Sequence, residues 1–216
     1  NGNYLFRDEF DKDRLNIRYS FLRTVKESWY SLKDVPGSLT LRLRPETATG
    51  KSNPSFVGFR QAHIKGYAAT ALRFTANAEN EKAGLLVFQN EKNHYYLCQS
   101  IKAGQQVVEL YKGDSLLLSK AVKIKKGKEI FFKAEAKGDQ YAFWYAVQKN
   151  KWMLLETLDG KWLSTKTAGG FVGCMYALYV TSNGKPSTNT ASFNWLEAKN
   201  DDDAYYSITM AYHGLR

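Results

Sequence analysis

The stretch that decides the fold is Leu158–Gly184, which reads LDGKWLSTKTAGGFVGCMYALYVTSNG. Within it, the run Phe171–Thr181 is apolar, aromatic and β-branched. Turn residues bound this run on both sides, with Gly169-Gly170 before it and Asn183-Gly184 after it. An apolar run between two turns is typical of a buried β-strand. The small residues inside the run further predict a central strand that is packed closely on both faces.

The other apolar runs predict neighbours for this strand. Helical periodicity is almost absent, whereas short β-branched or alternating runs recur at even spacing between turns. About a dozen such strands predict an all-β fold, an antiparallel two-sheet β-sandwich of jelly-roll type. The expected strands are Leu39–Leu43, Phe56–His63, Tyr67–Thr75, Gly84–Phe88, Tyr95–Ser100, Val107–Tyr111, Leu116–Ile124, Glu129–Ala136, Tyr141–Val147, Trp152–Thr157, Phe171–Thr181 and Ala191–Ala198.

The length of the chain predicts one domain, because 216 residues are an ordinary size for a single β-sandwich. We expect the sandwich to span residues 1–200, with residues 201–216 as a tail or as the last strand of the same domain. No apolar run reaches membrane-spanning length, so no membrane contact is expected. No signal segment opens the chain, and its first residue is Asn1, which predicts a processed chain or an excised fragment.

The chain is basic, with 31 Lys and Arg against 21 Asp and Glu and a formal net charge of +10. Such a charge suits either a polyanion partner or an ordinary basic surface. The basic residues occur only in short runs such as Lys123–Lys128, and no Arg-rich segment or RNA-binding pattern accompanies them. This distribution favours the basic surface, and no nucleic-acid partner is predicted.

The two cysteines, Cys98 and Cys174, each lie inside an apolar strand pattern. They could pair across two strands or serve as small buried hydrophobic residues. Their spacing does not indicate a zinc site. The pattern favours buried free thiols.

A sugar-binding surface needs aromatic rings that cover the apolar face of a sugar. Among the tryptophans, Trp152 and Trp162 flank turns and are the sugar-stacking candidates, whereas Trp195 alternates with Phe193 and is expected in the core. Burial in the core is the commoner fate of every tryptophan. A structural calcium ion is a further candidate, with Asp8 and Asn194 as ligands from the first and last strands. No other cofactor is expected.

Two segments near the end of the chain closely resemble the end of bacterial β-xylosidases and α-arabinofuranosidases of glycoside hydrolase family 43. They are DGKWLSTKTAGGFVGCMYALYVTSNG from Asp159 and NTASFNWLEA from Asn189. Three further segments resemble the same domain at the matching places: DEFDKDRLNIRYSFLR from Asp8, SFVGFRQAH from Ser55 and EKAGLLVFQNEKNHYYL from Glu81. The resemblance therefore spans nearly the whole chain in order.

The matching part of those enzymes is their C-terminal concanavalin A-like β-sandwich, and their catalytic groups lie on a separate β-propeller. The resemblance thus implies a non-catalytic accessory domain that packs on a catalytic β-propeller of the same polypeptide. It implies a plant cell-wall polysaccharide or oligosaccharide as the substrate of the whole enzyme. A bacterial, periplasmic or secreted location is favoured over the cytoplasm.

The carboxylates of this chain do not suggest independent catalysis. Glycoside hydrolysis needs a carboxylate base and a carboxylic acid that face each other across the sugar. Here the carboxylates cluster in Asp8–Asp13 and Asp201–Asp203, at expected strand ends, where solvated turn residues are typical. No catalytic residue is predicted.

In related enzymes a loop of the sandwich approaches the mouth of the propeller's pocket. By resemblance, His94 and its neighbours Asn93 and Tyr95 are candidates for that role, and the alternative for His94 is an exposed hairpin tip. Arg60, Gln61 and His63 are candidates to face the propeller or to support the loop. The family often has a second basic residue before the Arg-Gln pair, where this chain has a phenylalanine.

Two other functions fit a sandwich of this kind. An independent carbohydrate-binding module would present exposed aromatic rings on one concave face. A polyanion-binding protein would present a contiguous field of Lys and Arg. The accessory domain, in contrast, predicts an exposed apolar patch where the propeller packs.

Overall fold

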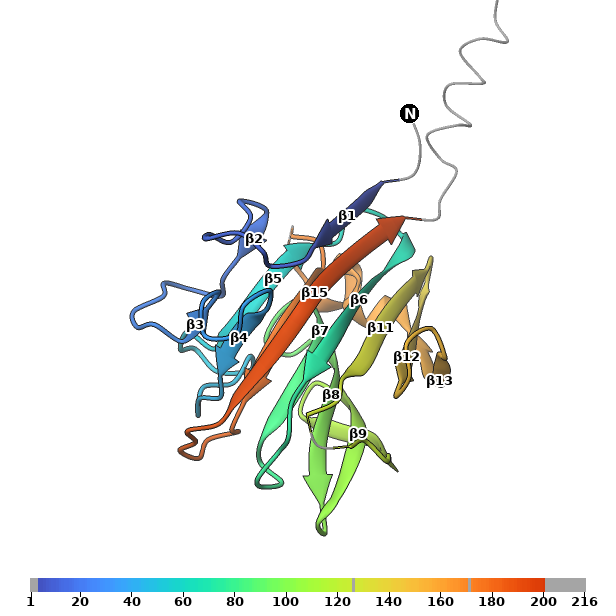
Figure 1. Ribbon diagram of the computed structural model, residues 1–216. Helices are drawn as coiled ribbons and strands as arrows, with labels where there is room; N and C mark the ends of the chain where they lie inside the picture. The colour runs from blue at the N-terminus through green and yellow to red at the C-terminus, as the bar shows by residue number, and fades with distance from the viewer. Residues whose placement is uncertain (1–3, 126, 171, 201–216) are drawn as a thin grey trace, which may run out of the picture.

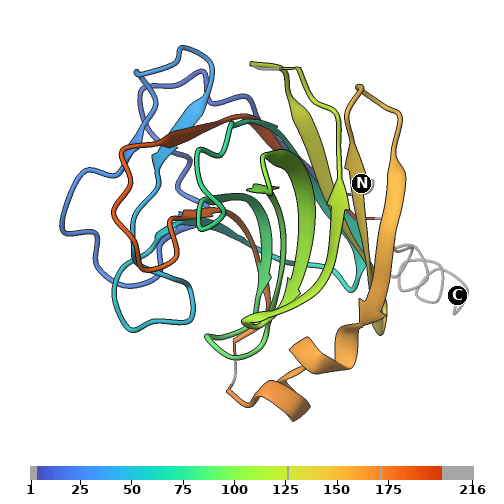
Figure 2. The ribbon, with the colours of Figure 1, turned by 90° about the horizontal axis from the view of Figure 1, so that it is seen from below.

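The computed structural model describes residues 4–125, 127–170 and 172–200, so the expected tail of residues 201–216 lies outside the described residues. Within these ranges the chain forms two antiparallel β-sheets that face each other as curved layers (Figure 1; Figure 2). The eight-stranded sheet contains β1 (Leu5–Asp8), β3 (Tyr30–Ser31), β4 (Leu39–Arg42), β6 (Lys65–Arg73), β11 (Ile130–Lys137), β12 (Gln140–Ala146), β13 (Met153–Asp159) and β15 (Thr190–Asn200). The seven-stranded sheet contains β2 (Tyr19–Ser20), β5 (Ser55–Arg60), β7 (Lys82–Phe88), β8 (His94–Lys102), β9 (Gln105–Lys112), β10 (Ser115–Ala121) and β14 (Met175–Thr181).

The predicted all-β two-sheet sandwich is therefore confirmed. The strand order is β13-β12-β11-β6-β15-β4-β3 in one sheet, with β1 also paired to β15, and β10-β9-β8-β7-β14-β5-β2 in the other. No helix in the described ranges is long and apolar enough to cross a membrane.

Strand β14 confirms the central strand predicted from the apolar run. It lies between β5 and β7, and all seven of its residues are buried. The strand is shorter than predicted, because it begins at Met175. Two short helices, η1 (Gly160–Leu163) and α1 (Thr165–Ala168), precede it, and neither was predicted from the sequence.

The core lies between the two sheets and follows the alternation of each strand. Inward-facing residues of the eight-stranded sheet meet those of the seven-stranded sheet, and many are fully buried. Burial of this apolar surface is the main driving force for folding. The large core residues include Leu39, Leu41, Leu72, Leu85, Phe132, Phe143 and Phe193.

Trp195 does not share the core face with Phe193, so that prediction is wrong. The pairing of β15 with β6 shifts by one residue between Phe193 and Trp195, which leaves Asn194 as the extra residue of a β-bulge. A bulge reverses which face the following side chains occupy. Trp195 consequently lies on the outer face, where it packs near Phe131 under the guanidinium of Arg7, at 4.3 Å.

A loop of residues 43–54 covers part of the outer face of the seven-stranded sheet. Ala48 of this loop is buried, and its N–H donates a hydrogen bond to the Tyr179 hydroxyl at 3.0 Å. Phe56 and Leu86 are fully buried beneath it, although they point away from the main core. The sandwich therefore has a second, smaller apolar cluster outside this sheet.

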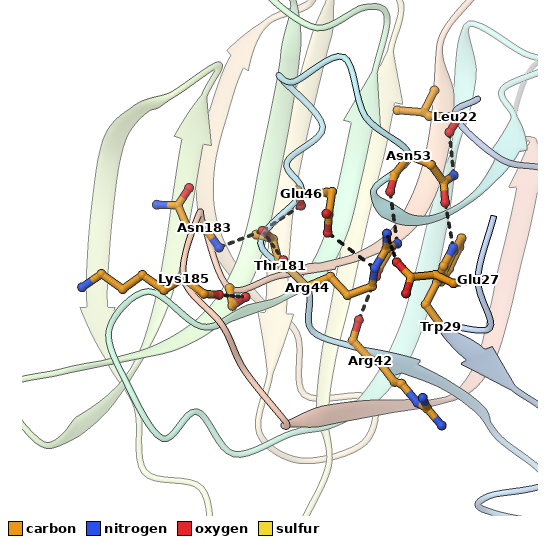
Figure 3. A network of polar contacts seen from close by, with 12 residues as sticks. Leu22, Glu27, Trp29, Arg42, Arg44, Glu46, Asn53, Thr181, Asn183 and Lys185 are labelled. Atoms are coloured by element: carbon orange, nitrogen blue, oxygen red, sulfur yellow. Dashed lines mark hydrogen bonds and ion pairs between the residues drawn. The ribbon is translucent and has the colours of Figure 1, made fainter. Parts of the chain in front are cut away.

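Arg44 holds this loop in place (Figure 3). Its guanidinium pairs with Glu27 at 2.7 Å and donates to the Asn53 carbonyl at 3.1 Å. The Asn53 side chain accepts a hydrogen bond from the Trp29 indole at 2.8 Å, and the Arg44 carbonyl accepts one from the Thr181 hydroxyl at 3.3 Å. The network therefore joins the loop both to the core and to the end of β14.

Glu81 joins two other loops and predicts a pH effect on stability. Its carboxylate accepts hydrogen bonds from Ser187 at 2.6 Å, from Asn189 at 2.7 Å and from the Asn77 N–H at 2.8 Å. Burial alone would raise the pKa of Glu81, but these hydrogen bonds outweigh it, so the pKa is lowered. A lowered pKa stabilises the fold above the unfolded value, and this contribution is lost as the pH falls through the folded value.

We therefore expect Glu81→Gln to lower the free energy of unfolding by about 1–3 kcal/mol near neutral pH. The difference from wild type should shrink as the pH falls below the unfolded value of about 4.5. Urea unfolding at a series of pH values measures both effects. If the difference in unfolding free energy between wild type and Glu81→Gln stays constant at acidic pH, the charge of Glu81 contributes nothing to stability.

Candidate functional site

One end of the sandwich gathers several loops and both ends of the described chain, and we call it the end face. Among the described residues it comprises 4–5, 61–65, 89–93, 137–141, 159–170, 172–174 and 199–200. In the seven-stranded sheet, Met175 pairs with both Arg60 and Phe88, which places the loops after β5 and β7 beside the start of β14. In the eight-stranded sheet, the Asn200 N–H donates to the Tyr4 carbonyl at 3.0 Å, so the first and last described residues lie together (Figure 1).

Two tyrosine hydroxyls join the sheets at this end. Tyr141 of β12 donates a hydrogen bond to the Gln61 side-chain oxygen at 2.6 Å, and Tyr95 of β8 donates to the Asp159 carbonyl at 2.8 Å. Burial and the nearby Asp159 raise the pKa of Tyr95 to about 12, so this hydroxyl stays protonated and remains a donor. The two bonds fix the spacing of the sheets where the loops leave them.

The segment Gly160–Cys174 is the most prominent part of the end face. It contains η1 and α1, and its helical part lies outside the two layers (Figure 2). The side chains of Asp159 and Ser164 cap the two helices by accepting hydrogen bonds from backbone N–H groups. Val172 within this segment is 56% exposed.

Three amide side chains hold this segment against the turn between β7 and β8, and we call them the anchor. Gln89 donates to the Val172 carbonyl at 2.5 Å, and Asn90 donates to the Ala168 carbonyl at 2.9 Å. Asn93, which is buried, donates to the Trp162 carbonyl at 2.9 Å. These bonds satisfy three backbone oxygens of the segment, whose described residues before Met175 belong to no strand.

Asn90 also folds the anchor itself. Its side-chain oxygen accepts hydrogen bonds from the N–H groups of Lys92 and Asn93, at 3.0 and 2.8 Å. This arrangement closes the turn locally. Asn90 thus closes its own turn and also donates a hydrogen bond to the neighbouring segment.

Arg60 and Gln61 attach the far end of the segment. The Arg60 guanidinium donates to the Gly173 carbonyl at 2.5 Å, and the Gln61 N–H donates to the Cys174 carbonyl at 3.0 Å. The Cys174 thiol donates to the Gln89 side chain at 3.3 Å, and burial raises the pKa of this thiol. Both cysteines are free, Cys98 buried and Cys174 half-buried, in agreement with the prediction of free thiols.

The structure therefore brings Arg60, Gln61, Asn93 and Tyr95 together as supports of the end face. His63 lies beside them, with its ring centroid 5.7 Å from that of Tyr4. His94 is not an exposed hairpin tip, because it is only 4% exposed and packs on Phe88 with ring centroids 6.0 Å apart. Burial lowers the pKa of His94, which favours the neutral imidazole.

The two tryptophan candidates do not form a common platform. Trp152 packs with the outer cluster of the eight-stranded sheet, whereas Trp162 packs at the end face against the main core. Each ring carries a lysine ammonium over it, Lys133 at 5.1 Å from Trp152 and Lys112 at 4.4 Å from Trp162. In each case the ammonium occupies one face of the ring, and the two rings lie on different parts of the fold.

The two calcium candidates have separate partners. Asp8 accepts a hydrogen bond from the Phe10 N–H at 2.9 Å, while Asn194 accepts one from the Ser38 hydroxyl at 3.0 Å and donates to Glu129. In the described part of the chain, no three His, Cys, Asp or Glu side chains group as metal ligands. The contacts of Asp8 and Asn194 are those of a turn and of a bulge.

Comparison with known proteins gives the family. A family model described as the β-xylosidase C-terminal concanavalin A-like domain matches residues 7–199. The chain belongs to this family. The family membership expected from the sequence, that of the C-terminal sandwich of family 43 glycoside hydrolases, is thereby confirmed.

Individual relatives agree with this family. The chain is 32% identical over 193 residues to the non-reducing end α-L-arabinofuranosidase of Bacteroides ovatus, covering 88% of this chain and 36% of the relative. It is 36% identical over 191 residues to a xylosidase/arabinosidase of Butyrivibrio fibrisolvens, covering 86% of this chain and 36% of the relative. A solved structure described as Bacteroides ovatus xyloglucan PUL GH43B matches with a TM-score of 0.84 at 31% identity, covering 90% of this chain and 39% of that one. The chain thus spans little more than a third of these relatives.

Proposed function

We propose that this chain is a non-catalytic accessory domain that packs through its end face on a catalytic β-propeller of the same polypeptide. In this proposal the segment Gly160–Cys174 borders the substrate pocket of that propeller and helps to shape it. The whole enzyme would act as a β-xylosidase or α-arabinofuranosidase on plant cell-wall polysaccharides or oligosaccharides. The observation that carries the proposal is the end face, where a held but projecting segment lies beside exposed aliphatic side chains.

The exposed aliphatic residues supply the first support. Leu5 is 58% exposed, Ile64 is 69% exposed and Val172 is 56% exposed, and all three belong to the end face. Aliphatic side chains that gather on one exposed surface are typical of a protein interface. Exposed aliphatic residues at this end support the expectation that an accessory domain presents an apolar surface to its partner.

The position of β1 supplies the second support. The first described residues, Tyr4 and Leu5, enter the fold at the end face. The relatives are longer than this chain, and the matching family is described as a C-terminal domain. In a protein built like those relatives, the preceding domain would connect at this end of the sandwich.

The anchor supplies the third support. A loop that contributes to a binding pocket loses less entropy on binding when it is already held in place. Gln89, Asn90 and Asn93 hold the segment in that way without sheet hydrogen bonds. His94 is buried beneath this turn and supports it. The residues that project from the end face belong instead to the segment Gly160–Cys174.

The test measures binding of this chain to the separately expressed propeller encoded with it, by calorimetry. We expect the double substitution Ile64→Asp with Val172→Asp to weaken binding by about a hundredfold, because two aliphatic contacts would be replaced by desolvated charges. Leu154→Asp is the matched control. Leu154 is 48% exposed but lies on β13 near the end opposite the end face, so binding should change by less than about twofold.

The same proteins are then tested for hydrolysis of aryl β-xyloside and aryl α-arabinofuranoside. This chain alone should hydrolyse neither, and its addition should raise the activity or thermal stability of the propeller. Hydrolysis by the chain alone would disprove the non-catalytic role. Normal binding by the double variant would disprove the end face as the interface.

A further inference from the structure

A pocket of about 450 Å³ lies on the outer face of the seven-stranded sheet, apart from the segment Gly160–Cys174. Its floor includes Tyr96 of β8, Tyr111 of β9 and Tyr179 of β14. The loop of residues 43–54 forms one wall, and the turn that carries Asp114 forms another. The volume falls in the range of small-molecule sites in proteins.

The tyrosines form a continuous aromatic floor. The ring centroids of Tyr96 and Tyr179 are 4.8 Å apart, and those of Tyr96 and Tyr111 are 6.5 Å apart. Tyr96 and Tyr179 are almost fully buried, whereas Tyr111 is half-buried and therefore partly open to solvent. A floor of aromatic rings, of which Tyr111 is partly open to solvent, suits the apolar face of a sugar.

The walls are held by hydrogen bonds to the floor or between themselves. The Ala48 N–H donates to the Tyr179 hydroxyl at 3.0 Å, and the Gly113 N–H donates to the His94 carbonyl at 2.9 Å. Between the walls, the Gly184 N–H donates to the Pro45 carbonyl at 2.9 Å. The pocket is thus formed before any ligand binds, which lowers the entropic cost of binding.

The charges of the pocket favour a neutral ligand. Lys82 is a half-buried cation of the pocket, and its ammonium pairs with the buried Glu109 carboxylate at 3.0 Å and lies 5.3 Å from the centroid of the Tyr111 ring. Tyr111 donates to the same carboxylate at 2.8 Å. Asp114 is exposed at the rim and would repel an anion. A phosphate or an acidic sugar therefore finds no uncompensated positive charge here, although the whole chain carries a formal charge of +10.

The polar groups of the pocket suit a ligand with many hydroxyls. Threonine hydroxyls of the 43–54 loop, the Asp114 carboxylate and the Asn183 amide surround the aromatic floor. The hydroxyls and the amide both donate and accept hydrogen bonds and the carboxylate accepts them, so each can pair with sugar hydroxyls. A purely apolar ligand would take the exposed Asp114 carboxylate out of water without a hydrogen bond, which costs binding energy.

We infer that this pocket binds a short neutral saccharide, with a sugar ring against Tyr111 and its hydroxyls toward Asp114 and Asn183. This site shares no lining residue with the end face, although its Asp114 wall adjoins the turn of residues 89–93, and it does not depend on the proposed packing against a propeller. It would give the domain a saccharide contact of its own, in addition to any role at the substrate pocket of a catalytic partner.

The test titrates the ¹⁵N-labelled chain with xylotetraose, arabinotriose or cellotetraose and follows the amide resonances. We expect at least one saccharide to shift the resonances of Gly113, Asp114, Asn183 and Gly184. Tyr111→Ala should weaken the affinity by about tenfold or more, since it removes the open ring of the floor. Asp114→Asn changes only an exposed turn residue, so the variant should fold, and it should weaken the affinity by about threefold or more.

Trp144→Ala is the matched control, because Trp144 is a half-buried aromatic residue on the outer face of the other sheet. The Trp144→Ala variant should bind the saccharide with the same affinity as wild type. Inorganic phosphate is the anionic probe and should cause no shift at the pocket. The inference is overturned if none of the saccharides shifts these resonances, if phosphate does so instead, or if the shifts appear only around Trp152 and Trp162. Loss of propeller binding at the end face would not produce any of these results.

Discussion

Replacement of Trp29 by alanine is expected to lower the free energy of unfolding by about 3–5 kcal/mol. Trp29 is only 1% exposed, and its ring packs against Phe21 with centroids 5.6 Å apart and against Tyr30 at 5.3 Å. Removal of the ring leaves a large cavity that rigid neighbours cannot fill. It also leaves the Asn53 side chain without the indole hydrogen bond that joins the core to the 43–54 loop.

Guanidinium unfolding followed by circular dichroism measures this effect, with Trp195→Ala as the control. Trp195 has the same size but is half-buried on the outer face, so its loss should cost about 1–2 kcal/mol. The loss of unfolding free energy in Trp29→Phe should fall between the losses in Trp29→Ala and Trp195→Ala, because phenylalanine keeps an aromatic ring but loses the hydrogen bond. Equal losses for Trp29→Ala and Trp195→Ala would contradict the assignment of Trp29 to the core.

The second large effect concerns the anchor. We expect the double substitution Asn90→Ala with Asn93→Ala to release the segment Gly160–Cys174 while the sandwich stays folded. The carbonyls of Ala168 and Trp162 lose their donors, which should cost about 1–3 kcal/mol per bond. Amide hydrogen exchange in the segment should rise by about tenfold or more, because local opening becomes easier than global unfolding.

Under the proposed function, the same double variant in a polypeptide that joins this chain to its catalytic propeller should lower kcat/KM for aryl β-xyloside by about tenfold. Gln99→Ala is the matched control. Gln99 is likewise a buried amide that donates to a backbone carbonyl, that of Phe74, but it lies near the opposite end of β8. It should destabilise the fold to a similar degree without changing exchange in the segment. Unchanged exchange in the double variant would show that the anchor does not hold the segment.

Most of the sandwich could be predicted from the sequence because its long strands carry their own signals. β6, β7, β8, β11, β12 and β14 are apolar or alternating runs between turn residues, and burial of one or both faces enforces that pattern. The two-residue strands β2 and β3 are too short to show any period. Trp195 was misplaced because a bulge adds one residue without changing the composition of the strand.

The end face was predicted less well, for a different physical reason. Helices η1 and α1 have four residues each, so neither shows a 3.6-residue period, and the capping residues Asp159 and Ser164 were their only signal. Arg60, Gln61, Asn93 and Tyr95 were chosen by resemblance, but what each of them holds depends on distant partners. Gln89 and Val172 are 83 residues apart, and Arg60 and Gly173 are 113 apart. Spacing in the sequence carries no information about such pairs.

The position of β15 has a consequence for how the protein is made. This strand lies between β6 and β4 and also pairs with β1, yet it is the last strand of the described chain to leave the ribosome. Until then the eight-stranded sheet exists as two separate halves, and the edges of β4 and β6 have no partner. Unpaired edges of this kind favour aggregation, and closure by a distant segment is slow. Before β15 is synthesised, the nascent sandwich therefore passes through an interval in which these edges are open to aggregation, and insertion of this single strand completes the sheet.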